Sequence, residues 1–345
     1  MRPVQRSSRA LVVACAAVAL LSAWTAAFAG DYEDKDFSLR FPAAMTRFAT
    51  YGDVAGIGGA SGGSKWSSSI NPASTAWLKD PPRNLCLSQQ YTRLWFGNGT
   101  SFDVPAESVT VDAGPLGFFT GAAAQISTNR ETMKNNGLDF YFAGDLAQLL
   151  WAKRFSKDLG AGFAFTYSKA VSRLSMGGFE VAKANCDSYA IRGGALYQFA
   201  DRFLTGLVLD YGWSSDRTVV AGAPPLKICD STRQFLVRPG VSYEYMEDGT
   251  VYLDYQFGTF SNDMGRMDVH RVLLGVEHGI TKWLFLRAGT ALDPVIGSSS
   301  VTCGIGFYPA SWFSLDVGYQ YDMFPELREE FGRSHALNVS VGFTF

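Results

Sequence analysis

The most constraining feature of this sequence is the alternation of side chains over residues 335–345. Every second residue from Leu337 to Phe345 is apolar, whereas the residues between them are Asn, Ser, Gly and Thr. Because successive side chains of a β-strand point to opposite faces, this period of two predicts a strand with one apolar and one polar face. The wall of a transmembrane β-barrel offers both environments, lipid on one side and a polar lumen on the other.

The same period of two continues upstream and is clearest over residues 233–246, 250–261 and 311–323. Short turns between these segments alternate with longer polar connections, an asymmetry typical of bacterial barrels. The longer connections are predicted at 97–106, 128–137, 173–186, 215–232, 261–267, 292–299 and 324–335. We therefore predict an all-β fold, a transmembrane antiparallel β-barrel of about 14 strands over residues 86–345. A soluble β-sandwich is the alternative, but it does not explain the two classes of turn or the final Phe.

Charged residues within the predicted strands indicate which face points into the lumen. An Arg or Lys facing lipid at mid-bilayer costs about 2–4 kcal/mol, so charges within strands are expected on the inner face. The predicted lumen charges are Arg192, Arg238, Asp254, Arg271, Glu277, Arg287 and Asp316. Their signs are mixed, which predicts a polar and roughly neutral lumen. The net charge of the whole chain is −2, which argues against nucleic acid as a partner.

The first residues have the pattern of an export signal. Arg2, Arg6 and Arg9 precede an apolar run, and Ala27-Phe28-Ala29 fits a small-x-small cleavage site, so residues 1–29 are predicted to be a signal peptide. A membrane anchor is the alternative, but the apolar run of about fifteen residues is short for a helical span. Export and barrel together predict localisation in the bacterial outer membrane, with outer-membrane lipids around the wall.

Residues 30–85 differ from the rest of the chain because they are rich in Gly, Ala and Ser and show little alternation. We predict that they form an N-terminal hatch or plug inside the barrel. The run from Gly56 to Gly63 could also be compared with a phosphate-binding loop, but it lacks the Lys-Ser/Thr that follows such loops. Closely packed glycines inside a barrel are therefore the preferred interpretation.

Two stretches of this segment, Asp53–Ala60 and Ser67–Ala73, resemble the hatch signature of the long-chain fatty-acid transporter family of outer-membrane barrels. The related type IX secretion shuttle and anchor barrels share that signature. The residues that carry the resemblance are Gly58, Gly59, Ala60, Asn71, Pro72 and Ala73. The resemblance implies that Asn71-Pro72-Ala73 closes the hatch against the wall. Ser74 departs from the family pattern, in which Gly usually follows Asn-Pro-Ala.

The resemblance also implies a ligand route. An outer groove between loops 173–186 and 215–232 would receive the ligand first, and a kink in the third strand near Gly121 would release it sideways. A third strand packed closely on the hatch is the alternative. The candidate ligand-binding residues on this route are Phe118, Phe119, Met176, Phe179, Leu226 and Ile228.

The cysteines suggest a disulfide rather than a metal site. None forms a C-x-x-C pair, so no metal or other cofactor is expected. Cys186 and Cys229 fall in the two long predicted loops, and an exported protein meets an oxidising compartment. We predict a disulfide between them, worth about 3–4 kcal/mol. His270, His278 and His335 lie outside any catalytic motif, so no enzyme activity is expected.

These features predict an outer-membrane channel for passive uptake of hydrophobic small molecules, either fatty acids or hydrocarbons. The first alternative is a barrel that does not transport and instead binds a protein partner in secretion or envelope assembly. A second alternative is a porin for polar solutes. The terminal aromatic residue, Phe345, is expected to be read by the barrel assembly machinery, by resemblance to outer-membrane barrels.

Overall fold

The computed structural model describes residues 37–47, 52–57, 59–60, 63, 69–77, 85–128, 138–222, 225–295 and 297–345. The predicted signal peptide and Gly58 lie outside the described residues. Within the described parts of the chain, no helix is long and apolar enough to cross a membrane.

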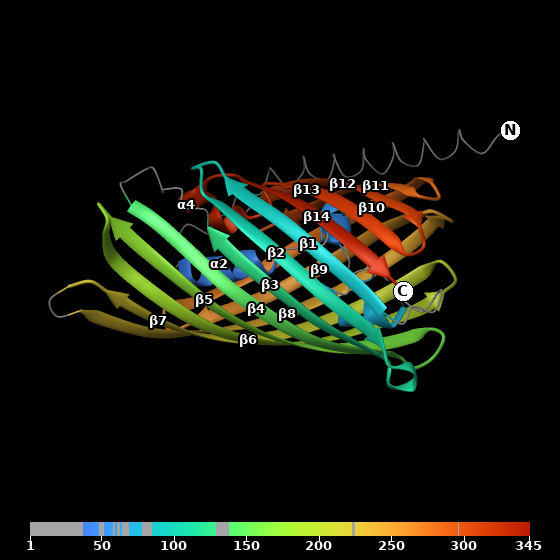
Figure 1. Cartoon of the computed structure of the whole chain (residues 1–345), viewed down its shortest axis with the longest axis horizontal. Helices are drawn as coiled ribbons and strands as arrows, with labels where there is room; N and C mark the ends of the chain where they lie inside the picture. Colours follow the sequence, from blue (N-terminus) through green and yellow to red (C-terminus); the bar gives the residue numbers. More distant parts are fainter. Residues whose placement is uncertain are drawn as a thin grey trace.

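The described strands form one closed antiparallel barrel in which each strand pairs with its neighbours in sequence and β1 pairs with β14 (Figure 1). The strands are β1 (Leu85–Phe96), β2 (Ser101–Asp112), β3 (Phe118–Thr128), β4 (Leu138–Arg154), β5 (Leu159–Met176), β6 (Phe179–Ala200), β7 (Phe203–Val220), β8 (Leu226–Met246), β9 (Gly249–Asn262), β10 (Gly265–Thr281), β11 (Leu284–Asp293), β12 (Ser298–Ala310), β13 (Phe313–Tyr321) and β14 (Ser334–Thr344). The predicted antiparallel barrel of about fourteen strands is confirmed.

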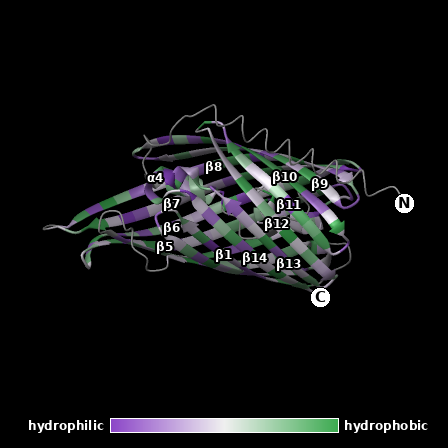
Figure 2. Cartoon of the chain, turned by 90° about the horizontal axis from the view of Figure 1, so that it is seen from above, coloured by the Kyte–Doolittle hydropathy of each residue, from purple (hydrophilic) through white to green (hydrophobic). Residues whose placement is uncertain are grey.

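Strand β14 closes the barrel with the faces that its alternation predicts. The Phe345 amide donates to the Leu85 carbonyl over 2.9 Å, which marks the inner end of the barrel. On the lumen face, the Thr92 hydroxyl donates to the Asn338 side-chain oxygen over 2.6 Å, and both residues are buried. Leu337 and Phe343 are exposed on the outer face. The same alternation of hydrophilic and hydrophobic residues runs around the wall (Figure 2).

Strands β5–β8 are longer than a bilayer requires. They contain 18, 22, 18 and 21 residues, whereas about 9–11 tilted residues span a membrane. Tyr167, Tyr189 and Trp213 stack side by side on the outer face, with ring centroids 5.1 and 5.3 Å apart, as in an interfacial aromatic girdle. The strand ends beyond this girdle form a projection that we call the tongue: residues 168–176, 179–188, 214–220 and 226–232 (Figure 1).

The prediction of loops at 173–186 and 215–232 is wrong, because the strands of the tongue include most of these residues. Most of these residues belong to strands, and the β5–β6 connection is a tight turn at Gly177 and Gly178, both with positive φ. Polar composition suggested loops, but antiparallel pairing satisfies the backbone outside a membrane as well as inside one.

Short helices of the N-terminal segment occupy the lumen, as expected for a hatch. Helix α2 (Phe37–Met45) lies against β9 and β10, α3 (Gly52–Gly56) against β11–β14, and the 3-10 helix η1 (Pro72–Trp77) against β4–β6. Together they contact most of the wall, so the hatch crosses the lumen from one side to the other.

Wall glycines leave room for the hatch backbone. A Cβ added at Gly162 would lie 2.6 Å from the Pro72 carbonyl carbon, and one at Gly275 would lie 2.6 Å from the Ile57 oxygen. One at Gly194 would overlap Asn71. These distances are far below van der Waals contact, so the hatch backbone packs directly on the strands, as glycine permits.

Candidate functional site

An apolar patch lies on the lumen-facing side of the tongue. Met176 pairs with Phe179, and Val220 pairs with Leu226. Alternation places Leu226 and Ile228 on the same face of β8 as the buried Leu236 and Arg238. Phe179 is 80% exposed and Leu226 is 60% exposed. The structure therefore places the four predicted groove residues, Met176, Phe179, Leu226 and Ile228, on the same face of the tongue, although strands rather than loops present them; we call this face the tongue patch.

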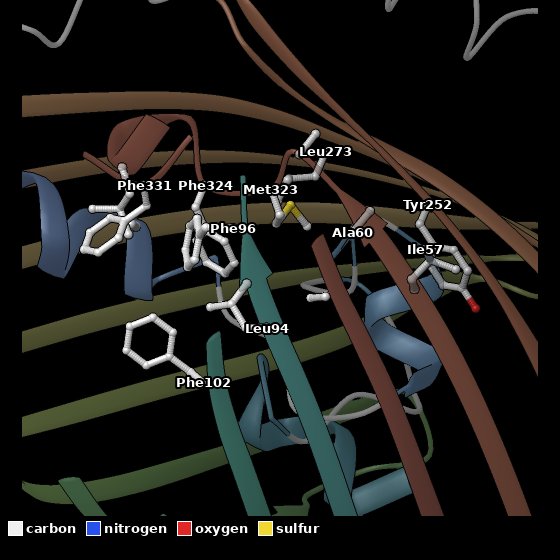
Figure 3. Packing of buried hydrophobic residues seen from close by; sticks show 14 residues of the cluster. Ile57, Ala60, Leu94, Phe96, Phe102, Tyr252, Leu273, Met323, Phe324 and Phe331 are labelled. Atoms are coloured by element: carbon white, nitrogen blue, oxygen red, sulfur yellow. The ribbon is translucent and has the colours of Figure 1, made fainter. Parts of the chain in front are cut away.

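A second apolar site lies in the outer half of the lumen (Figure 3). Phe96 is the centre of an aromatic cluster, with ring centroids 5.2 Å from Phe331 and 6.0 Å from Phe102. A small gap beside it, which we call the aromatic pocket, is lined by Phe41, Met45, Leu94, Phe96, Phe102, Ile126, Leu327 and Phe331. These side chains offer no strong hydrogen-bonding group, so the gap that they surround is apolar.

The connection between β13 and β14 covers this pocket from outside. It contains the 3-10 helix η3 (Pro325–Leu327) and helix α4 (Arg328–Phe331). Phe324, Leu327 and Phe331 are buried, so this segment folds into the mouth of the barrel. We call residues 322–333 the outer loop. Sequence reasoning treated this stretch as a polar connection, although its apolar residues at 323, 324, 327 and 331 signal burial.

A buried cluster of charges joins the outer loop to the hatch and the wall. Glu326 of the loop accepts hydrogen bonds from Arg47 of the hatch over 2.9 Å and from Arg271 of β10 over 2.6 Å. Asp293 lies 2.9 Å from Arg47. Burial by itself raises the pKa of Glu326, but Arg47 and Arg271 outweigh it and hold that pKa below its ordinary value. Glu326 therefore stays ionised at neutral pH.

Wall arginines also hold the hatch elsewhere. Arg192 pairs with Asp210 over 2.6 Å and donates to the Ser69 carbonyl over 2.7 Å. Arg238 pairs with Asp254 over 3.0 Å and donates to the Gly59 carbonyl. In each case a carboxylate of the wall neutralises the guanidinium, and a remaining N–H of the guanidinium donates to a backbone carbonyl of the hatch.

The remaining lumen charges form a separate group near α3. Arg287 lies 2.5 Å from Glu277 and 2.6 Å from Asp316. All seven predicted lumen charges therefore face the interior, and each belongs to an ion pair. Asp293, Glu326 and Arg47, which complete the buried cluster, were not singled out from the sequence, because their partners lie on distant segments.

The hatch motif contacts the wall through Asn71. Its side-chain nitrogen donates to the Ala195 carbonyl on β6 over 3.1 Å, and its oxygen accepts from the Ala73 amide over 3.0 Å. Pro72 and Ala73 are buried in η1. Gly59 adopts φ +77°, a left-handed conformation that favours glycine, and Ala60 is buried. These contacts are structural, and they place the motif between hatch and wall.

Phe118 and Phe119 do not share a site. They are consecutive residues of β3 and point to opposite faces, so Phe118 is 2% exposed in the lumen whereas Phe119 is 47% exposed on the outer face. Both lie at the inner end of the strand, after the turn at η2 (Gly114–Leu116). Of these two predicted ligand-binding residues, only Phe118 therefore faces the lumen.

The ladder between β2 and β3 lacks two residue pairs beside the aromatic pocket. Asp103 pairs with Ser127 and Ala106 with Ala124, but Val104 and Pro105 make no ladder pair with β3. Proline has no N–H to donate, which accounts for the interruption. Ile126 lines the pocket at this level. The residue that indicates this gap in the ladder is therefore Pro105 rather than Gly121. A Cβ added at Gly121 would meet no atom within 4 Å.

The predicted disulfide is contradicted by the strand register. Cys186 on β6 pairs with Asp216 on β7, and Asp216 pairs with Asp230 on β8. Cys229 is the neighbour of Asp230, so its side chain points to the opposite face of the wall. Both thiols are free, and a whole strand separates them.

Each of the three histidines lies within hydrogen-bonding distance of a tyrosine. Nδ1 of His270, His278 and His335 lies 2.6–2.9 Å from a tyrosine hydroxyl. Among the described residues, no group of three or more His, Cys, Asp or Glu side chains is placed to hold a metal ion.

The closed barrel with its hatch defines a class of fold, that of outer-membrane transport barrels. Its solved examples include the CymD monoaromatic hydrocarbon channel, with 13% identity and TM-score 0.59 over 86% of this chain and 98% of that one. The Ralstonia pickettii toluene transporter TbuX has 10% identity and TM-score 0.55 over 79% and 91%. A Pseudomonas aeruginosa FadL homologue has 12% identity and TM-score 0.55 over 86% and 98%. No family model and no curated protein matches the sequence. The hatch motif indicated a resemblance to the fatty-acid transporter barrels, and these comparisons confirm that resemblance at the level of the fold.

Proposed function

We propose that the protein is a bacterial outer-membrane channel for passive uptake of hydrophobic small molecules. The aromatic pocket carries this proposal, because it is an apolar site in a lumen otherwise rich in charges. Its ligand would first meet the tongue patch, then pass the outer loop, and leave sideways where β2 and β3 are not paired. Transfer of apolar surface from water is favourable by about 25 cal/mol per Å², so this route needs no other energy source.

The pocket favours an uncharged hydrocarbon over a fatty acid. A carboxylate buried without a partner is costly, and the nearby described arginines are already engaged by protein carboxylates. Arg47 and Arg271 share Glu326 and Asp293, and Arg40 pairs with Glu330. Two fold neighbours, a monoaromatic hydrocarbon channel and a toluene transporter, agree with this choice.

A matched pair of probes tests the ligand class. Purified protein in detergent is titrated with p-xylene and with p-toluate, in which a carboxylate replaces one of the two methyl groups. We expect p-xylene to bind and p-toluate to bind at least about ten-fold more weakly, about 1.4 kcal/mol. Absence of binding by either probe, together with co-purification of a secreted protein, would instead favour the protein-binding alternative. That alternative draws support from the filled lumen.

The substitution Ile126→Gln tests the pocket itself. It places an amide among apolar side chains, and burial of that amide beside an apolar ligand costs about 1–3 kcal/mol. We expect the Kd for p-xylene to rise about 5–150-fold, measured by tryptophan fluorescence or calorimetry. Ser127→Gln, on the outer face of the same strand, is the matched control and should leave the Kd unchanged. Equal effects of the two substitutions would place the ligand elsewhere.

A further inference from the structure

The outer loop is bounded by two backbone positions with unusual conformations. Asp322 has φ +56° and is the only non-glycine residue with positive φ among the described residues, and Gly332 has φ +78°. Left-handed backbone at both ends lets the chain turn sharply into the mouth and out again. Gly97 donates to the Arg333 carbonyl and Asn98 to the Phe331 carbonyl, each over 3.0 Å. The carboxyl end of the loop is thus attached to the β1–β2 turn.

The segment between these positions forms the roof of the aromatic pocket. Leu327 and Phe331 are two of the pocket's lining residues, and Phe331 packs on Phe96. Phe324 contacts the same ring, with centroids 6.4 Å apart. The tongue patch lies outside this roof. Residues 323–331 therefore cover the pocket on the side of the barrel mouth.

Ion pairs, rather than strand pairing, hold the roof to the hatch. Glu326 binds Arg47 and Arg271, and Arg40 of α2 pairs with Glu330 and donates to the Glu326 carbonyl over 3.2 Å. Two of these three arginines belong to the hatch. The contact is therefore able to separate as a unit, and the freed charges then face the water-filled mouth.

We propose that residues 323–331 are a lid over the aromatic pocket and that Glu326, bound by Arg47 and Arg271, is its latch. The lid opens about the positions of Asp322 and Gly332, and opening admits the ligand from the tongue patch. The passage of ligand rests on the proposed function, whereas the movement of the lid does not. The latch also couples the lid to the hatch, because Glu326 of the lid binds Arg47 of the hatch.

Chemical labelling tests the lid without any ligand. Leu327→Cys is introduced into protein whose natural cysteines are replaced by Ser, and its reaction with a membrane-impermeant maleimide is followed in outer membranes. We expect slow labelling of the Leu327→Cys protein. The further substitution Glu326→Gln should accelerate it at least about ten-fold, which corresponds to a loss of about 1.4 kcal/mol in the free energy of lid closure. Asp263→Asn, at an exposed position on the turn between β9 and β10, is the matched control, and it should change the rate less than two-fold. Equal rates in all three backgrounds would overturn the proposal.

A disulfide lock provides a second test that does not depend on folding of the Glu326 variant. Met45 and Leu327 line the same pocket from hatch and loop, so Met45→Cys/Leu327→Cys is oxidised and then reduced. We expect p-xylene uptake by proteoliposomes to fall to the protein-free level when oxidised and to recover with reductant. Unchanged uptake in the oxidised form would overturn the lid. Absence of uptake in both forms would refute the proposed channel, and the labelling result would still decide whether the lid moves.

Discussion

Substitution of Gly194 by Val is expected to unseat the hatch and let ions through the barrel. Gly194 lies on β6 under Asn71, and even a Cβ at this position would overlap the Asn71 side chain. Neither the strand nor η1 can yield easily, because Asn71 is also bound to the Ala195 carbonyl. Overpacking of this kind costs about 1–3 kcal/mol, which shifts the ratio of displaced to seated hatch about 5–150-fold. Conductance of single barrels in planar bilayers measures the effect directly.

The neighbouring residue supplies the control for this experiment. Gly193 lies on the same strand but faces outward, and a Cβ there would meet no atom within 4 Å. Gly193→Val should therefore leave the conductance at the wild-type level while adding the same side chain to the same strand. If Gly194→Val barrels were as closed as Gly193→Val barrels, the hatch would not be seated on this glycine.

Removal of one partner of a buried ion pair is expected to have the largest effect on stability. Arg238 and Asp254 lie 3.0 Å apart, and both side chains are buried. Arg238→Met leaves the Asp254 carboxylate in the lumen without its guanidinium and removes the bond to the Gly59 carbonyl. The expected loss is about 3–5 kcal/mol of unfolding free energy. Urea unfolding in detergent micelles, followed by tryptophan fluorescence, measures this loss.

Two further variants distinguish the loss of the buried ion pair from a general effect of replacing arginine by methionine. Arg266 and Asp268 also lie 3.0 Å apart, but their side chains are 62% and 41% exposed, so Arg266→Met should cost less than about 1 kcal/mol. The double substitution Arg238→Met/Asp254→Leu removes both charges and should recover much of the loss. A double variant as unstable as Arg238→Met would show that packing, not charge, dominates at this site.

Local periodicity explains how much of the fold the sequence could predict. Alternation over 335–345 and over the other clear strands depends only on which neighbouring residues are apolar, so barrel class, strand number and inward-facing charges could be read directly. The hatch was recognisable because its composition lacks this alternation. The four residues of the tongue patch were also identified, although their polar surroundings wrongly indicated loops.

The remaining features depend on contacts between segments far apart in the chain. Cys186 and Cys229 appeared suitable partners in two loops, but register across three strands turns their side chains to opposite faces. The aromatic pocket combines residues from α2, β1, β2, β3 and the outer loop, none of which has a local pattern that names the others. The same holds for Glu326 and Arg47, which are 279 residues apart in sequence.

The sequence by itself therefore determined the barrel, its two faces and the presence of a hatch, because these follow from the side-chain period and composition of single segments. Only the tertiary structure decided where the lumen is apolar, which carboxylate neutralises each arginine, and that the outer loop closes the mouth. The physical reason is that burial and charge pairing depend on neighbours brought together by closure of the barrel. A strand's own residues set its two faces, but they do not specify what lies against the inner one.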